Sequence, residues 1–207
     1  MKNFISGYCS IRNSKIRLNG KTVFEQKDEL NSFLTNAYRK FNINYPKFFK
    51  MDLLCKLAFI SSEILLKENK LAGKYEGNET ALVLSNHASS LDTDRNYFKT
   101  IEDRKNYFPS PSVFVYTLPN IMIGEISIRN KITGENVFFV SEKFNAELLF
   151  NYTNMLLCDK NSACVLAGWM DVDKEKYDGF IYMIEKANPN PVCEHDAEQV
   201  SALYYKG

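Results

Sequence analysis

The chain has 207 residues, of which 45% are hydrophobic and 14% aromatic, so it can build one domain with a sizeable core. Its net charge of +1, with acids and bases interspersed, argues against a broad nucleic-acid-binding surface. No apolar run reaches the length of a membrane span, and the first residues lack the apolar segment of a signal peptide, so we expect a cytoplasmic protein.

Hydrophobic patterning predicts strands that alternate with helices. Residues 13–29 are polar and contain a turn signal, Asn19-Gly20. In chain order we expect a strand at 4–12, helices at 30–41 and 51–67, a strand at 80–85, helices at 96–105 and 111–129, a strand at 137–140, a helix at 142–157, strands at 163–167 and 179–186, and a terminal helix at 197–205. This alternation predicts an α/β fold with a layered, mixed sheet and flanking helices.

Residues 108–140 carry the most specific pattern. They read FPSPSVFVYTLPNIMIGEISIRNKITGENVFFV: a helix, a Gly-Glu-Asn turn and a short apolar strand. Together with TALVLSNHASSLDTDRNYF from residue 80 and ACVLAGWMDV from residue 163, this order resembles the N-terminal half of β-ketoacyl synthases of the thiolase fold. The resemblance implies that residues 1–207 form a single domain, half of a thiolase-like fold, with the family's C-terminal catalytic half absent.

In that family a reactive cysteine directly follows the strand. Ungapped counting from Asn136 places that position at Lys143, and slips of one residue give Glu142 or Phe144. A thiolate is needed to accept an acyl chain, whereas an amine would form an inert amide. Two catalytic histidines belong to the family's second half. The resemblance therefore implies that this chain has no ketosynthase activity of its own and needs no cofactor.

The same resemblance implies partners. Cysteine-less relatives include chain-length-factor subunits, among them those of aryl polyene pathways, which pair with an active ketosynthase. We expect such a heterodimer, or a homodimer, formed around the strand at 137–140, with an acyl carrier protein as a further partner. Arg129 and Lys131 could contact that carrier, or they could be the charged last turn of a helix at 112–130.

An acyltransferase function is the alternative hypothesis. NHASSLD places His87 and Asp92 in the histidine-x4-aspartate pattern of glycerolipid acyltransferases, in which the histidine acts as a general base and the aspartate orients it. The preceding strand gives the right context. The phosphate-binding stretch of those enzymes is missing, since FPSPS at 108–112 lacks both glycine and arginine.

The remaining chemistry-bearing residues have structural interpretations. Cys193, His195 and Asp196 are too few for a zinc site, so we expect a solvated tail and no metal. Cys158 and Cys164 are expected in the core, as free thiols. A second interpretation of 141–143 is an ordinary helix start, with Ser141 as N-cap and Glu142 in the first turn. The sequence leaves open whether a pocket lies beside Phe114, Tyr116 and Trp169.

Overall fold

The computed structural model describes residues 2–71, 73–158 and 162–206. Its strands are β1 (Phe4–Arg12), β2 (Lys15–Leu18), β3 (Lys21–Glu25), β4 (Thr80–Asn86), β5 (Asn136–Val140), β6 (Cys164–Asp173), β7 (Lys176–Glu185) and β8 (Cys193–Glu194). Its helices are α1 (Leu30–Lys40), α2 (Leu53–Glu68), α3 (Leu91–Phe98), α4 (Pro111–Phe114), α5 (Ile121–Asn130), α6 (Ala146–Cys158) and α7 (Ala197–Lys206). Short 3-10 turns lie at Pro46–Lys50, Gly77–Glu79 and Val115–Thr117.

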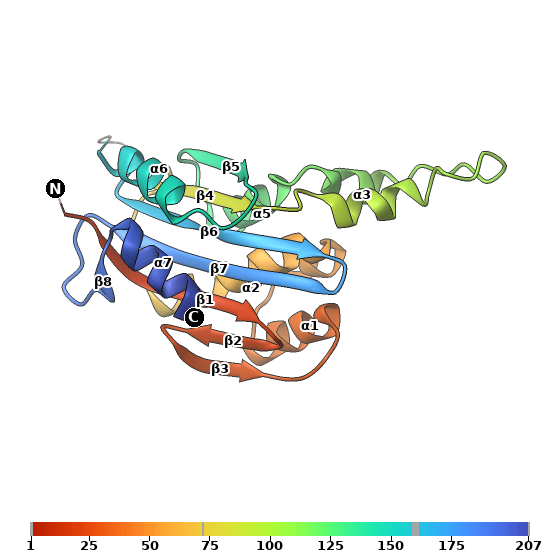
Figure 1. Cartoon of the computed structure of the whole chain (residues 1–207). Helices are drawn as coiled ribbons and strands as arrows, with labels where there is room; N and C mark the ends of the chain where they lie inside the picture. The colour runs from red at the N-terminus through yellow and green to blue at the C-terminus, as the bar shows by residue number, and fades with distance from the viewer. Residues whose placement is uncertain (1, 72, 159–161, 207) are drawn as a thin grey trace.

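All these strands belong to one mixed sheet, with the order β3-β2-β1-β7-β6-β4-β5 and with β8 beside β1 (Figure 1). β4 runs parallel to β5 and β6, while β7 is antiparallel to both of its neighbours, β6 and β1. β1, β4, β5 and β6 therefore point the same way. The carboxyl ends of β4 and β5 consequently lie side by side at one end of the sheet, where open α/β sheets place their functional loops.

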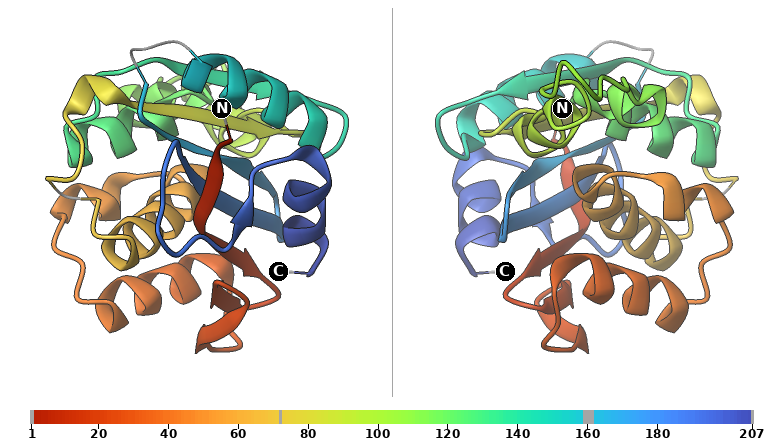
Figure 2. Two further views of the ribbon diagram at one scale, coloured as in Figure 1. Left: turned by 90° about the vertical axis from the view of Figure 1, so that its left-hand side faces the viewer. Right: turned by 90° about the vertical axis from the view of Figure 1, so that its right-hand side faces the viewer.

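Helices cover the sheet on both faces, as two further views show (Figure 2). β4 is buried along its whole length because it lies in the middle of this sandwich. Leu82 and Leu84 face the layer of α1, α2 and α5, whereas Ala81 and Val83 face the layer of α6 and α7. This confirms the expected α/β class with a layered, mixed sheet.

The expected helix at 111–129 is wrong in one respect, because the chain breaks it into α4, a 3-10 turn and α5. Pro119 is the cause. It offers no amide hydrogen, and it forces Leu118 into extended backbone with φ −101° and ψ 111°. The break lets α5 turn back and pack on α2, while α4 stays beside α3.

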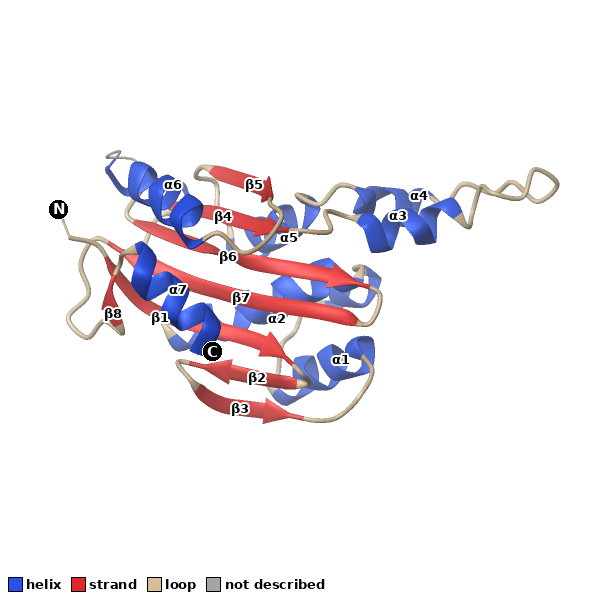
Figure 3. Cartoon of the chain, in the orientation of Figure 1, coloured by secondary structure: helices blue, strands red, loops and turns tan. Residues whose placement is uncertain are grey.

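α3 and α4 belong to an arm that extends away from the sheet (Figure 3). The expected helix at 96–105 is misplaced, since α3 begins at Leu91 and ends at Phe98. Asp92 and Asp94 lie in its first turn, where acidic residues favour a helix N-terminus. Residues 13–29 also hold more structure than expected: β2 and β3 form a hairpin whose Asn19-Gly20 turn has φ of 50° and 80°. Within the described residues, no helix combines the length and apolar character that crossing a bilayer requires.

Candidate functional site

β5 forms one edge of the sheet and carries no charged residue. It pairs with β4, and no other described strand lies beyond it. Its last residue, Val140, is 60% exposed. The opposite edge strand, β3, begins with Lys21 and ends with Glu25, the kind of charged pattern that discourages edge-to-edge pairing. Of the two edges, β5 is therefore the one suited to an added partner.

The hydrogen-bond register shows which backbone groups of β5 are open. The Leu82 amide donates to the Glu135 carbonyl (2.9 Å), and the Ser141 amide donates to the Asn86 carbonyl (2.8 Å). Odd-numbered residues of this segment thus bond to β4. The amide and carbonyl groups of the even-numbered residues, with Phe138 at the centre, point away from the sheet.

Two helices flank this edge, α5 on one face of the sheet and α6 on the other (Figure 1). Each exposes one large apolar side chain: Ile128 of α5 is 65% exposed and Met155 of α6 is 55% exposed. Phe139 packs edge-on against Tyr152 of α6, with ring centroids 5.2 Å apart. α6 is therefore in contact with β5. We call the open edge of β5, together with Ile128 and Met155 on the two flanking helices, the β5 face.

The segment after β5 contains the predicted nucleophile position. Glu142 and Lys143 are exposed and lie in a bend. Phe144, by contrast, is buried and stacks on Tyr204 of α7, with ring centroids 3.7 Å apart and planes within 8°. The segment directly after the strand therefore presents an exposed acid, an exposed amine and a buried phenyl ring, and no thiol.

α6 starts later than the sequence pattern suggested. The expected helix at 142–157 begins at Ala146, and Ser141 is not its cap. The Asn145 side chain accepts a hydrogen bond from the Leu148 amide (2.9 Å), which is the usual role of an N-cap residue. Asn145 before an apolar run was the sequence signal for this start. Residues 141–144 lie before the helix, and over this segment the chain turns so that Phe144 enters the core.

The acyltransferase pair is not assembled by a hydrogen bond. His87 is exposed, and its backbone amide donates to Asp171 (3.0 Å). Asp92 accepts a hydrogen bond from the Lys174 amide (3.2 Å). Among the described residues, no hydrogen bond joins His87 to Asp92.

The expected solvated tail is wrong. His195 is only 5% exposed, because β8 folds back along β1 and places its ring near Tyr182 and Phe150. Burial lowers the pKa of His195 to about 4, and the negative charge of Asp196 opposes this shift by a smaller amount. Asp196 caps α7 by accepting a hydrogen bond from the Gln199 amide (2.7 Å). The described part of the chain contains no cluster suited to hold a metal ion.

The thiols are free in the described structure and differ in burial. Cys9, Cys55 and Cys164 are buried, and burial raises the pKa of Cys9 to about 12. Cys193 is partly exposed. The prediction that Cys158 lies in the core is wrong, because it is exposed at the end of α6. Cysteine is usually a buried residue type, but Cys158 lies on the outer side of the last turn of α6 and is therefore exposed.

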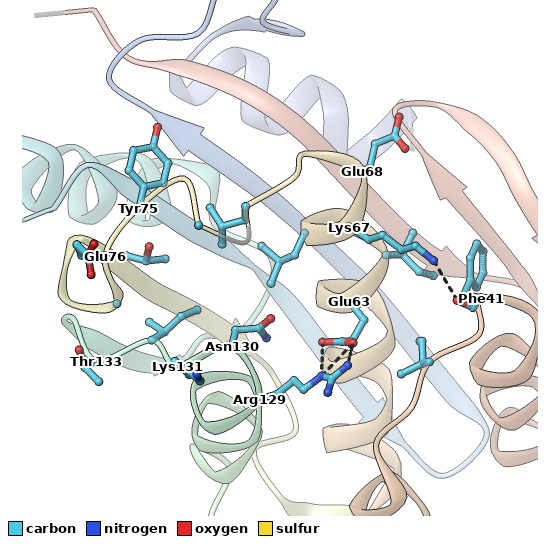
Figure 4. Close-up of a pocket in the computed structure, with 18 of the residues that line it drawn as sticks. Phe41, Glu63, Lys67, Glu68, Tyr75, Glu76, Arg129, Asn130, Lys131 and Thr133 are labelled. Atoms are coloured by element: carbon cyan, nitrogen blue, oxygen red, sulfur yellow. Dashed lines mark hydrogen bonds and ion pairs between the residues drawn. The ribbon is translucent and has the colours of Figure 1, made fainter.

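A cleft of about 1130 Å³ lies over the C-terminal half of α2 (Figure 4). At its centre Arg129 of α5 pairs with Glu63 of α2, with Nη2 to Oε2 at 3.1 Å. Arg129 does occupy the last turn of α5, and Lys131 ends that helix in left-handed backbone with φ 56°. The pair itself was missed by the sequence reading, although Glu63 is the one acid inside a long apolar helix pattern.

The three aromatic residues named as possible pocket walls are separated. Tyr116 borders a cavity of about 560 Å³, together with Met51, Asp52, Thr93 and others. Phe114 is 52% exposed on the arm, and Trp169 belongs to the core on the other face of the sheet. Tyr116 therefore lines a cavity that neither Phe114 nor Trp169 borders.

Comparisons with known proteins give the fold. No protein-family model and no curated protein matches the chain. Solved structures do match. The ishigamide ketosynthase/chain length factor has a TM-score of 0.63 at 14% identity, covering 92% of this chain and 63% of that one. The complex of the ketosynthase ApeO with its chain length factor ApeC from Xenorhabdus doucetiae gives 0.59 at 10% identity, covering 99% and 92%.

A third match is the AntDE:AntF complex, a type II polyketide synthase acyl-carrier protein with its ketosynthase, at TM-score 0.61 and 12% identity, covering 89% of this chain and 62% of that one. The chain thus spans somewhat over three fifths of two of these structures and nine tenths of the other. Its fold is that of the ketosynthases and chain length factors, a thiolase-like α/β fold.

Proposed function

We propose that this thiolase-like chain is a non-catalytic subunit that pairs with an active β-ketoacyl-ACP synthase through the β5 face. The observation that carries the proposal is the open, uncharged edge of β5 between two helices that expose Ile128 and Met155. An edge with outward-facing amides and carbonyls gains hydrogen bonds when another strand adds to it. Exposed apolar side chains beside it would be buried by the same partner.

The site after β5 supports the non-catalytic half of the proposal. Acyl transfer to a ketosynthase requires a thiolate at this place. Here Phe144 is packed into the core and Lys143 is exposed. The subunit would act by shaping its partner, as a chain length factor does, in a fatty-acid-like or polyene pathway. Contact with an acyl carrier protein follows from the same proposal.

Co-expression tests the pairing. The full chain is produced together with a full-length β-ketoacyl synthase from the same organism, and one of the two proteins is tagged. The molar mass of the purified complex is measured by light scattering after size-exclusion chromatography. We expect a one-to-one complex. Val140→Lys should abolish it, because a charge would be placed at the exposed end of the edge.

Thr22→Lys is the matched control. Thr22 is exposed on β3, the opposite edge of the same sheet, so the added charge is equal and only its place differs. A complex that survives Val140→Lys, or one that Thr22→Lys disrupts equally, would contradict the assignment of the β5 face. A chain that binds no ketosynthase and forms only homodimers would contradict the heterodimer, and loss of those homodimers in Val140→Lys would show that the same edge pairs with itself.

A further inference from the structure

The cleft over α2 lies apart from the carboxyl end of β5 and has the features of a ligand site of its own. Its floor is the second half of α2, one wall is the chain after α1, and the other wall is the end of α5 with residues 131–133. Its volume of about 1130 Å³ lies slightly above the range of typical small-molecule pockets. Figure 4 shows the Arg129–Glu63 pair between the two walls.

The lining divides into an apolar part and a set of cations. The apolar part is provided by partly exposed side chains on one wall and by the edges of buried ones beneath them: Leu18, Phe41, Ile43, Ile64, Leu71 and Ile132. The cations are Lys67, Arg129 and Lys131. An apolar surface beside positive charge suits an amphiphile better than a wholly polar solute.

The hydrogen-bonding capacity of the cleft favours an anion. Glu63 accepts from both Nε and Nη2 of Arg129 and is therefore occupied. Glu76 caps a 3-10 turn, and Figure 4 places Glu68 away from Arg129. Donors are left over: among the described residues, Nη1 of Arg129 has no hydrogen-bond partner, and Lys67 has one long bond, 3.3 Å, to the Phe41 carbonyl.

We infer that this cleft binds a single-chain amphiphile with a carboxylate head. The head would lie between Lys67 and Arg129, where charge-assisted hydrogen bonds are available. The chain would lie along Phe41, Ile43 and Leu71. The carboxyl ends of α1, α2 and α5 border the cleft, and their partial negative charge disfavours an anion. Cations offset this charge: Lys67 lies in the last turn of α2 and donates to the Phe41 carbonyl at the end of α1. Arg129 and Lys131 lie at the end of α5.

Titrations of the ¹⁵N-labelled full chain with decanoate, decylamine and acetate test the inference by amide chemical shifts. We expect saturable binding of decanoate, with shifts in residues 129–133 and around Lys67. Acetate, which has no chain, should not saturate. Decylamine, which reverses the charge, should bind at least about tenfold more weakly, as one or two charge-assisted bonds require.

Three variants should change the affinity for decanoate in three different ways: one weakens it, one leaves it unchanged and one strengthens it. Lys67→Gln should weaken decanoate about three- to tenfold. Lys70→Gln, the same change three residues later and outside the cleft lining, should leave it unchanged. Glu63→Gln should tighten decanoate several-fold, because it releases the Arg129 guanidinium from its carboxylate partner.

The inference is overturned if decanoate gives only diffuse, non-saturating shifts, if decylamine binds as well, if Lys70→Gln weakens binding as much as Lys67→Gln, or if Glu63→Gln fails to tighten it. The result is independent of the pairing proposal. Val140→Lys alters the β5 face, and the affinity for decanoate should be the same in that variant as in the unchanged chain.

Discussion

Replacing Phe144 tests whether the segment after β5 contributes to the hydrophobic core. Its ring stacks on Tyr204 and meets Trp169 and Phe180 edge-on, with centroids 6.2 and 5.9 Å away. It is 8% exposed. Truncating a buried Phe to Ala costs about 3–5 kcal/mol through lost transfer energy and the cavity left behind. Because the site lies near the surface and can partly collapse, we expect about 3 kcal/mol for Phe144→Ala.

Urea unfolding measures this cost. Trp169 is the only tryptophan and lies against Phe144, so its fluorescence reports both global unfolding and local repacking. The neighbouring Lys143→Ala removes an exposed side chain and should change the free energy of unfolding by less than about 0.5 kcal/mol. A loss below about 1 kcal/mol for Phe144→Ala, or a loss as large for Lys143→Ala, would refute the reasoning.

Further predictions concern stability and use the same unfolding assay. Burial lowers the pKa of His195 from 6.5 to about 4, so the unfolded chain binds this proton before the folded chain does as the pH falls. The free energy of unfolding should therefore decrease by about 3 kcal/mol between pH 6.5 and 4. His195→Gln should flatten this pH dependence. Glu185 is fully buried and accepts hydrogen bonds from four side chains, so Glu185→Gln should cost about 1–3 kcal/mol. In Gly168→Ala the new Cβ would overlap a backbone carbonyl of β7, and the free energy of unfolding should fall by more than about 1 kcal/mol. Gly124→Ala, on α5 with open space around it, should instead raise it by about 0.5 kcal/mol, and a loss there would contradict the steric argument.

The positions of β4 and β5 were predictable because their signal is local. Apolar runs bounded by polar turns at 80–85 and 137–140 predict β4 and β5 to within one residue, and helical spacing at 51–67 predicts α2 within two. The expectation that the strand at 137–140 is buried was wrong, because β5 is an edge strand and none of its residues is buried. β6 also continues six residues beyond the expected strand at 163–167. The alternation of strands and helices predicted the α/β class, and the resemblance to β-ketoacyl synthases implied the thiolase-like fold, which the solved structures confirm. Whether residues 1–207 form the single domain that the resemblance implies stays a prediction.

The failures have physical causes that periodicity does not report. The apolar pattern continues through Pro119, so the pattern alone runs α4 and α5 together. His195 looks like a tail residue until β8 pairs with β1, nearly two hundred residues earlier in the chain. The pair of Glu63 and Arg129 likewise joins two helices that are far apart in sequence. Contacts of this kind depend on the packed fold, and no short window of residues contains them.

In the proposed function, the segment after β5 and the edge of β5 have separate roles. Phe144 turns inward and packs against α7 and the sheet, which leaves no thiol at the position after the strand. The proposed pairing would depend on the backbone of β5, whose outward groups around Phe138 do not take part in the packing of Phe144. Phe144→Ala should therefore lower stability without weakening the complex wherever the variant stays folded, and Val140→Lys should do the reverse. If both variants lowered both quantities together, packing after β5 and recognition along its edge would be one property, and a subunit could not keep one while losing the other.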